Sequence, residues 1–494
     1  MLYVRNSLSG KKELFEPLNP PYVKMYACGI TTYDVSHIGH AMQAMAFQMI
    51  RRYLEYSGYK VVYVRNYTDV DDKIIARAKE SKMSASGLSK QIIEMTQKDF
   101  AELGIEPADH RPKVSEMIPQ IISFIEMLIA KDFAYATPDG HVYFRVRNYP
   151  EYGKLSRRNI DDQHHVTRDT VVAGKEDPLD FALWKADSNE TFSWQSPWGK
   201  GRPGWHIECS AMIHSILGEH IDIHGGGRDL VFPHHENEIA QSESCFGSPL
   251  AKYWLHSGLL SIDKQKMSKS LGNHISIRDF LKTYPAEVLK FTCLQHHYRL
   301  DMDLSHKAFM DTDKKLFSYY FLLEQVNSFL ESHNTSTSSH PELWTANDSF
   351  YAKWKEEFCT SMDDDFNSVK AIAGVHKIFK DMRLTINSNS SDEDKINTFV
   401  NFQKCIHDIA KVFAVFVENP TLYMKHFQTR YLNHLKLSED IITAKIEERQ
   451  AARKRRDFTT ADLIRDELSH QGILLNDQKD HPESTNWTFN FHLI

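Results

Sequence analysis

The pattern of hydrophobic and polar positions near the amino terminus predicts an α/β unit. Residues 22–27 alternate like a strand, which Cys28 and Gly29 are expected to end. Apolar side chains then recur at helical spacing through 41–57, and 60–65 form a β-branched strand. Because strand, helix and strand follow one another in this order, we expect a parallel sheet.

The same α/β character returns over 205–300. Residues 221–224 and 253–257 predict two short strands, and the spacing between them predicts a helix from about 233 to 246. The region from about 115 to 204 instead has helical and hairpin-like pieces with many turn signals. We expect this region to be an insertion into the α/β domain.

From about residue 305 the spacing of apolar positions is helical. Ser-rich stretches at 331–340 and 387–394 predict loops, and a segment from about 426 predicts charged helices and a short tail. We therefore expect an α/β fold with three regions: 1–304, 305–425 and 426–494.

The composition is that of a globular protein. The chain has 494 residues, of which 41% are hydrophobic and 25% charged, and this excludes a disordered chain, a collagen or a disulfide miniprotein. The net charge is −7, so any contact with nucleic acid must use a local basic patch.

The sequence also indicates a cellular location. The amino terminus has no apolar run of the kind that marks a secretory signal, and the most apolar long run, 117–130, is too short to span a bilayer. The six cysteines form no CxxC pair, which suits a reducing compartment. We expect a cytoplasmic protein without a membrane segment.

The tetrapeptide His37-Ile-Gly-His40 stands where a loop enters the first predicted helix. A helix amino terminus offers unpaired N–H groups that favour phosphate, and Gly39 lets a nucleotide approach the backbone closely. Two imidazoles there can donate to phosphate oxygens in a transition state. The alternative is an ordinary loop with two surface histidines, since 26 histidines make chance pairs plausible.

A second phosphate signal, Lys266-Met-Ser-Lys-Ser270, lies far downstream. Two lysines on a small flexible loop can neutralise a triphosphate, although basic turns at the surface are also common. Together and in this order, the two motifs resemble the HIGH and KMSKS signatures of class I aminoacyl-tRNA synthetases.

A set of metal-binding residue types accompanies these motifs. On a helix, His234 and Glu238 share one face while His235 faces elsewhere. Cys28 ends the first strand, and Cys209 is a second soft donor. Two thiolates, an imidazole and a carboxylate are a plausible zinc set, but four buried side chains without metal remain the alternative.

The chain resembles the cysteinyl-tRNA synthetase family over essentially its whole length. The matching stretches are 25–34, 66–73, 203–210, 222–227, 234–238, 361–367 and 461–468. The resemblance implies a Rossmann-like parallel-sheet catalytic domain with an insertion, a helical bundle and a small C-terminal anticodon-binding module. The substrates would be L-cysteine, ATP with Mg²⁺, and tRNA(Cys), and we expect a monomer.

The resemblance also assigns roles to residues. The family's ligands for one Zn²⁺ per chain fall on Cys28, Cys209, His234 and Glu238. Its catalytic positions fall on His37, His40, Lys266 and Lys269. ATP contacts fall on Ile30, Gly39, His40, Lys266, Ser268 and Lys269, and amino-acid contacts on Gly29, Thr68, Trp205 and Asp229.

A zinc ion would help the site to distinguish cysteine from serine. Packing alone separates near-isosteres such as cysteine and serine by only about 10²-fold. Zinc prefers a soft thiolate and deprotonates a coordinated thiol, so a zinc ion that contacts the substrate would select cysteine. Four protein ligands usually close a zinc site, so this hypothesis requires the site to expand or the carboxylate to loosen.

The sequence departs from the family at a few positions. Met42 and Gln48 stand where relatives carry Arg and Asp, Thr32 replaces a valine, and Arg228 replaces a serine. Two other hypotheses therefore stay open. One is a cysteine-activating ligase with a small-molecule amine acceptor, and the other is a non-catalytic, zinc-containing RNA-binding paralogue.

Two features near the carboxyl terminus suggest RNA contacts. Residues 445–456 carry six basic side chains that would form a stripe on a helix, and Trp487 could stack on an unpaired base. A solvated helix face and a tryptophan that closes a small core are the alternatives.

Overall fold

The computed structural model describes residues 1–159, 174–187, 192–262, 265–266, 274–335, 349–477 and 485–489. The chain divides into two compact units. The first unit is Met1–His306, Thr345–Lys380 and Val400–Val415, and the second is Lys307–Trp344, Asp381–Phe399 and Phe416–Ile494. No helix in the described part of the chain is long and apolar enough to cross a bilayer.

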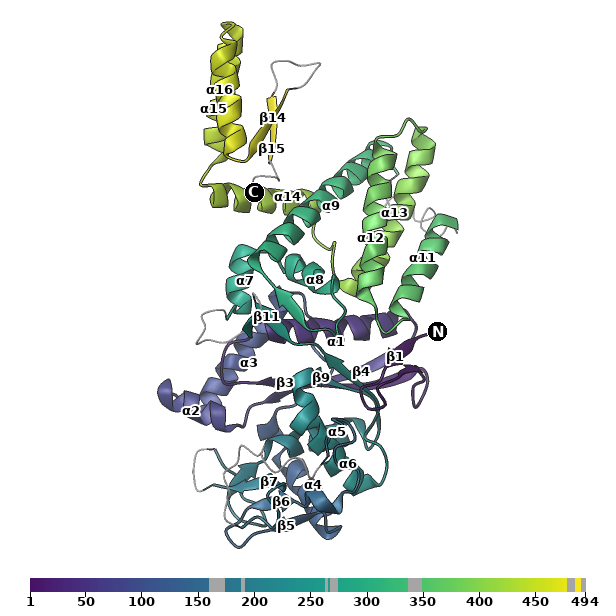
Figure 1. Cartoon of the computed structure of the whole chain (residues 1–494), viewed down its shortest axis with the longest axis vertical. Helices are drawn as coiled ribbons and strands as arrows, with labels where there is room; N and C mark the ends of the chain where they lie inside the picture. Colours follow the sequence, from purple (N-terminus) through teal and green to yellow (C-terminus); the bar gives the residue numbers. More distant parts are fainter. Residues whose placement is uncertain are drawn as a thin grey trace. The chain divides into compact units, whose positions relative to one another are not determined.

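A four-stranded parallel sheet lies at the centre of the first unit (Figure 1). Its strand order is β10-β9-β3-β4, with β3 at Tyr22–Thr31, β4 at Lys60–Thr68, β9 at Ile221–Gly227 and β10 at Ala251–Ser257. All three strand pairs are parallel, which confirms the parallel sheet expected from the sequence.

Strand β3 does not end at Cys28 and Gly29 as predicted. It continues to Thr31 through a register shift between Ala27 and Ile30. Gly29 is required at this irregularity, because a Cβ atom there would lie 1.6 Å from the carbonyl oxygen of Asn66.

Helices cover both faces of the sheet (Figure 1). Helix α1 (Ile38–Tyr56) lies on one face, and α5 (Trp205–Leu217) and α6 (Glu236–Phe246) lie on the other. Phe47 of α1 packs against β9 so closely that a Cβ atom on Gly225 would lie 2.1 Å from its ring. Helices α2 (Asp72–Glu80) and α3 (Ala85–Glu102) follow β4, and α7 (Ile277–Thr283) and α8 (Ala286–Leu294) follow β12.

The region between α3 and α5 was expected to contain helical and hairpin-like pieces, and the structure has an α-helix and antiparallel strands there. Helix α4 (Ile118–Ala130) precedes an antiparallel sheet of order β5-β6-β7-β8. These strands are Ala134–Ala136, Val142–Phe144, Phe181–Ala186 and Gly201–Pro203. Trp184 of β7 is fully buried in the core that this sheet shares with α4 and α5.

Two small sheets complete the first unit. Strands β1 (Tyr3–Arg5) and β2 (Lys12–Leu14) form an antiparallel pair. Strand β11 (Leu260–Ile262) pairs with β12 (Gln265–Lys266) and with β13 (Met302–Leu304).

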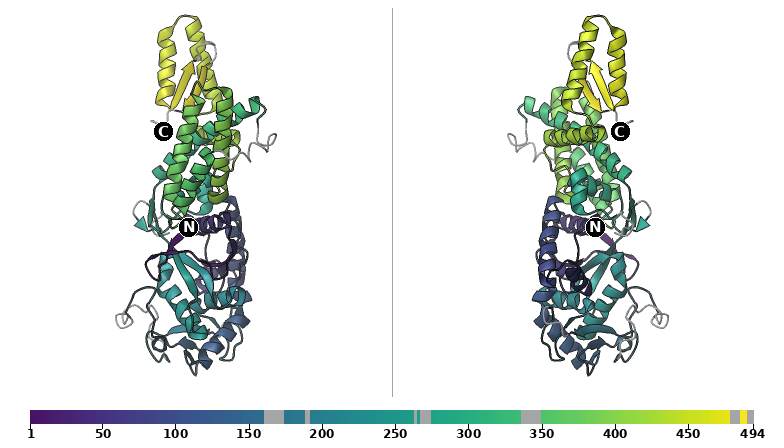
Figure 2. Two further views of the ribbon diagram at one scale, coloured as in Figure 1. Left: turned by 90° about the vertical axis from the view of Figure 1, so that its right-hand side faces the viewer. Right: turned by 90° about the vertical axis from the view of Figure 1, so that its left-hand side faces the viewer.

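The remainder of the described chain is mostly helical, as the sequence predicts. The helices are α9 (His306–Ser332), α11 (Ser349–Met362), α12 (Ser368–Ile386), α13 (Asp392–Phe413) and α14 (Pro420–Leu435). Helices α15 (Glu439–Lys454) and α16 (Phe458–His470) then lie beside a hairpin of β14 (Ile473–Asp477) and β15 (Thr485–Phe489) (Figure 2). A core that includes Phe427, Ile446, Ile464 and Phe489 joins α14, this helix pair and the hairpin.

Candidate active site

Two cysteines, a histidine and a glutamate meet beneath the central sheet. Cys28 comes from β3, Cys209 from α5, and His234 and Glu238 from the turn into α6 and from α6 itself. The two Sγ atoms are 3.9 Å apart, and Cys209 Sγ lies 3.6 Å from His234 Nε2. Glu238 Oε1 lies 3.0 Å from His234 Nε2 and 3.6 Å from Cys28 Sγ. We call these four residues the thiol cluster.

The thiol cluster fits a tetrahedral zinc ion. Zinc bonds of 2.0–2.3 Å place neighbouring ligand atoms roughly 3.3–3.8 Å apart. The four ligand atoms of the cluster all lie within 4.8 Å of one another, and all four residues are buried. Two soft sulfurs with one nitrogen and one oxygen also form a donor set that zinc accepts.

Electrostatics inside the thiol cluster favour the ionised forms of Cys209 and Glu238. Hydrogen bonds from Cys28 and His234 lower the pKa of Cys209 to about 6. Burial opposes ionisation of Glu238, but the neighbouring His224 and His234 hold its pKa well below the usual value. Burial raises the pKa of Cys28, so this second thiol needs a cation beside it before it ionises.

His235 was expected to face away from the cluster, and this expectation is wrong. Its Nε2 atom lies 3.4 Å from Cys28 Sγ, and its Nδ1 atom lies 2.8 Å from His256 Nε2. Residues Val231–His235 form a π-helical turn in which Phe232 leaves helical geometry, so the spacing of a regular α-helix does not hold there. The predicted contact between His234 and Glu238 is nevertheless present.

Three of the four predicted amino-acid contacts lie beside the thiol cluster. Trp205 begins α5 and stacks on His234 with ring centroids 4.4 Å apart, while 38% of its surface stays exposed. Gly29 follows Cys28 in β3 and donates its backbone N–H to Asn66 Oδ1 at 2.8 Å. Thr68 is buried at the end of β4 and accepts a hydrogen bond from Asn66 at 3.3 Å. The structure therefore groups an exposed indole, a backbone and a hydroxyl around one corner of the cluster.

The fourth predicted contact, Asp229, is exposed in the turn Arg228–Leu230 that follows β9. A Cβ atom on Gly227 would lie 2.4 Å from its carboxylate, so the glycine leaves room for this side chain to fold back.

Glu208 was not singled out from the sequence. It is buried beside Cys209 and Thr68. Burial, together with the nearby Cys209 and two aspartates, raises its pKa well above the ordinary value. In the sequence, Glu208 stands between the predicted site residues Trp205 and Cys209, and this position was the only signal that could have identified it.

His37 and His40 cap the amino terminus of α1 with their own side chains. Nδ1 of His37 accepts from the N–H of Gly39 at 3.1 Å, and Nδ1 of His40 accepts from the N–H of His37 at 3.4 Å. The two rings stack with centroids 3.8 Å apart. Because each Nδ1 accepts a backbone proton, each neutral imidazole carries its own proton on Nε2.

Burial lowers the pKa of His40 well below the ordinary value, and the nearby His37, Arg65 and His274 add to this shift. His40 is therefore neutral at physiological pH. It offers a hydrogen-bond donor without carrying a charge.

The second phosphate motif is described only in part. Lys266 belongs to β12, where it pairs with Ser261, whereas Ser268 and Lys269 lie outside the described residues. The segment that follows the motif is anchored to the first motif: the N–H of Ile38 donates to Ile275 at 3.1 Å. The rings of His274 and His37 are 5.1 Å apart, so the chain leaving the KMSKS segment contacts the histidine pair.

The predicted ATP contacts Ile30 and Gly39 lie close to this histidine pair along the chain. Ile30 is buried in β3, where it pairs with Tyr67 of β4. Gly39 is the second residue of α1, and its N–H is the group that His37 caps.

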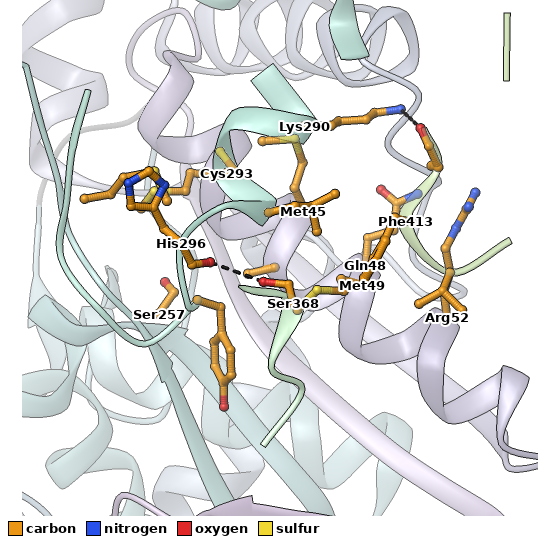
Figure 3. Close-up of a pocket in the computed structure, with 17 residues that line it drawn as sticks. Met45, Gln48, Met49, Arg52, Ser257, Lys290, Cys293, His296, Ser368 and Phe413 are labelled. Carbon is orange, nitrogen blue, oxygen red and sulfur yellow. Dashed lines mark hydrogen bonds between the residues drawn. The ribbon is translucent and has the colours of Figure 1, made fainter. Parts of the chain in front are cut away.

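Met42 and Gln48, the two departures from the family in α1, line one cavity of about 50 Å³. Figure 3 shows Met45, Gln48 and Met49 of α1 in its wall, together with Cys293 of α8. Gln48 donates to the carbonyl of Gly104 at 3.2 Å. Met42 and Gln48 therefore contribute an apolar side chain and a neutral amide to the wall of the same cavity.

The features suggested as RNA contacts are partly engaged within the protein. Arg449 forms a two-pronged ion pair with Asp477 at 2.8 Å, and Arg453 pairs with the same carboxylate at 3.0 Å. Trp487 is half-buried and meets Phe489 edge to face with centroids 5.4 Å apart. Of the six basic residues in the stripe, Lys454, Arg455 and Arg456 are exposed at the end of α15.

Comparison with known proteins extends these observations to the whole chain. Residues 14–314 match the family model of the class I (C) tRNA synthetase catalytic domain. A cysteine–tRNA ligase of Sulfurihydrogenibium is 42% identical over 98% of this chain and 99% of its own length. The chain belongs to the cysteine–tRNA ligase family. A cysteine–tRNA ligase of Geobacter metallireducens is 43% identical with the same coverage.

Two further matches agree with membership of the cysteine–tRNA ligase family. Residues 357–417 match the DALR domain. Among solved structures, methionyl-tRNA synthetase of Mycobacterium tuberculosis in complex with methionyl-adenylate matches with a TM-score of 0.60 at 13% identity, over 85% of this chain and 94% of that one. At this identity the likeness concerns the fold, and it confirms the predicted class I architecture.

Proposed function

We propose that this chain joins L-cysteine to the 3′ end of tRNA(Cys) in two steps. The carboxylate of cysteine first attacks the α-phosphate of ATP, giving cysteinyl-adenylate and pyrophosphate. A terminal ribose hydroxyl of the tRNA then takes the acyl group and releases AMP. The observation that carries this proposal is the thiol cluster, which fits a thiol-selecting metal and lies beside Gly29, Thr68 and Trp205.

The histidine pair of α1 acts on the phosphate in this proposal. The capping bonds use the Nδ1 atoms of both rings, so the Nε2 protons are the groups that would donate to phosphate oxygens. Their donation would strengthen as negative charge develops on the pentacoordinate phosphate. Lys266 and Lys269 would hold the departing pyrophosphate, and Ile30, Gly39 and Ser268 would line the ATP site with them.

The thiol cluster supplies amino-acid specificity. Cys28, Cys209, His234 and Glu238 would hold one Zn²⁺, which supplies a soft Lewis acid that prefers sulfur to a hydroxyl oxygen. Trp205 would form the wall of the amino-acid pocket, and Gly29, Thr68 and Asp229 would contact the backbone groups of cysteine. Mg²⁺ would accompany ATP.

The remaining assignments follow from the same proposal. Residues 426–494 would contact the anticodon, 305–425 would form the intervening bundle, and 1–304 would be the catalytic domain. We infer that the protein is a monomer. We also infer that it is cytoplasmic, because the sparse cysteines without a CxxC pair suit a reducing compartment.

Transfer of radiolabelled cysteine to tRNA(Cys) tests this function. We expect cysteine-dependent ATP–pyrophosphate exchange together with acid-precipitable cysteinyl-tRNA, and no charging with serine. Exchange without transfer to tRNA would contradict the proposal and favour a small-molecule acceptor. Absence of both activities in folded, metal-loaded protein would favour a non-catalytic RNA-binding role.

A further inference from the structure

A second pocket lies on the α1 face of the central sheet, whereas the thiol cluster contacts α5 and α6 on the opposite face (Figure 1). It has a volume of about 190 Å³ and lies between α1, β4 and the end of α3. Buried side chains such as Ile30, Tyr63 and Tyr67 form its floor. Exposed side chains, including Gln97 and Arg111, stand at its mouth, so a small molecule can reach it from solvent.

Arg65 of β4 lines this pocket, and one nitrogen of its guanidinium is unpaired within the described part of the chain. Its guanidinium lies over the ring of Phe100, 5.2 Å from the ring centroid. Its Nη2 atom is buried and has no hydrogen-bond partner among the residues that the structure describes. A buried charged donor without a partner is costly, so the arrangement favours a ligand that accepts from this nitrogen.

The charges around Arg65 point to a negative ligand. Arg111 is a second cation in the lining, and Glu106 is the single carboxylate among the lining residues. Glu106 already accepts from Arg52 Nη2 at 2.6 Å, so its charge is balanced by a cation that does not line the pocket. Gln48 lines the pocket from α1 as a neutral amide and does not provide a counter-ion. The pocket therefore has an excess of positive charge.

We propose that this pocket binds the oxyanion of a small molecule, a phosphate or a carboxylate, through Arg65. Guanidinium groups form charge-assisted hydrogen bonds with both kinds of oxyanion. The volume holds one such group and a short attached body, and Phe100, Tyr63 and Tyr67 give that body an aromatic wall. Its lining residues include none of the thiol cluster and neither His37 nor His40, but Ile30 on its floor is also a predicted ATP contact, so the pocket borders the proposed ATP site.

Calorimetric titration of the full-length protein with inorganic phosphate, and separately with benzoate, tests the proposal. We expect saturable binding of at least one probe to the wild type. Preferential binding of phosphate would identify a phosphorylated ligand, and preferential binding of benzoate would identify a carboxylate with a planar body. Failure of both probes to bind at 10-mM concentrations, about the weakest range of useful affinity, would overturn the proposal.

Two variants locate the binding. Arg65→Gln removes the donor, and Gln48→Glu adds a carboxylate to the same pocket that would pair with Arg65. We expect each change to weaken binding at least about tenfold, as loss of a charge-assisted hydrogen bond implies. Lys60→Gln, which removes an exposed cation from the same strand, is the matched control and should bind as the wild type does.

Gln48→Glu keeps the proposal testable if Arg65→Gln does not fold, since it retains the arginine and nearly the same side-chain shape. Anion binding that persists unchanged in folded Gln48→Glu protein would place the anion elsewhere, for example at the nucleotide site, and would overturn the proposal. Because neither variant alters a residue proposed to bind cysteine or ATP, aminoacylation reports separately on the proposed function.

Discussion

His224 donates a hydrogen bond from Nε2 to Glu238 Oε2 at 2.8 Å, and both side chains are completely buried. The ring of His224 stacks on Trp254 with centroids 4.3 Å apart, which fixes its orientation. One oxygen of Glu238 is therefore held by β9, while the other faces His234 and Cys28. This contact orients the carboxylate within the thiol cluster.

Replacement of His224 should weaken metal binding without removing a ligand. We expect His224→Ala to lower zinc affinity by about 10- to 100-fold, the usual effect of losing a hydrogen bond to a metal ligand. Competition with a chromophoric chelator measures this affinity. His220→Ala is the control, since His220 is half-buried and hydrogen-bonds to Ser248 and the Pro249 carbonyl, outside the thiol cluster. Equal zinc affinity in the His224 variant and the wild type would show that Glu238 needs no such support.

Cys209→Ser should lower bound zinc and weaken cysteine binding. A hydroxyl is a harder and much less acidic donor than the thiol, whose pKa is about 6 in this cluster. Elemental analysis and cysteine-dependent exchange measure the two effects. Cys245→Ser is a matched buried control outside the cluster. Full zinc occupancy in the Cys209 variant would remove Cys209 from the ligand set.

His37→Asn should separate the capping role of this residue from its catalytic role. Asparagine is a good N-cap, so we expect the free energy of unfolding to change by less than about 1 kcal/mol. The Nε2 donor is lost, so the exchange rate should fall by about 10²-fold or more. Urea denaturation and exchange kinetics measure the two quantities. Normal exchange in the folded variant would contradict a role in phosphate stabilisation.

Lys269→Ala should slow adenylate formation strongly while leaving zinc content normal. The lost ammonium would no longer neutralise the departing pyrophosphate, and we expect a decrease of about 10²-fold in the exchange rate. Lys282→Ala provides a control, because Lys282 is an exposed lysine of α7. Unchanged exchange kinetics would refute the assigned role.

His256 should make the stability of the first unit depend on pH. Burial, with smaller effects of His224, Arg299 and Arg228, lowers the pKa of His256 to about 3. Below about pH 6.5 the His256 side chain is protonated in the unfolded chain but not in the folded chain. The free energy of unfolding is therefore not reduced by His256 above that pH. The free energy of unfolding decreases as the pH falls from there toward 3.

Urea denaturation of wild-type and His256→Asn protein at several pH values measures this effect. Between about pH 6 and 4, the free energy of unfolding of the wild type should fall more steeply than that of the variant, by about 1.4 kcal/mol per pH unit. Parallel curves would show that His256 is not held neutral by the fold.

Much of the site could be predicted because its chemistry lies in short motifs. His234 and Glu238 stand four residues apart and meet as a helix requires. By contrast, nothing in the spacing of Cys28 and Cys209 selects them from six cysteines, and the resemblance to a family was needed. The parallel sheet followed from alternation and from the order of the elements.

Two predictions, the orientation of His235 and the end of β3, were wrong because the backbone there departs from regular helix or strand geometry. His235 contacts Cys28 because Phe232 interrupts the helix, and β3 passes through Cys28 because Gly29 permits a close approach to Asn66. The contacts of Glu208, His224 and Arg65 depend on residues distant in the sequence, which no local pattern reveals. Trp487 packs on Phe489, which favours the core alternative.

X-ray absorption at the zinc edge of the purified protein, without and with L-cysteine, tests whether the thiol cluster holds a zinc ion that binds the sulfur of the substrate. We expect two sulfur neighbours at about 2.3 Å and two nitrogen or oxygen neighbours at about 2.0–2.2 Å in the free protein. Addition of L-cysteine, but not of L-serine, should add a third sulfur. An absence of bound zinc, or a sulfur count that L-cysteine leaves unchanged, would contradict selection of the substrate through its thiol.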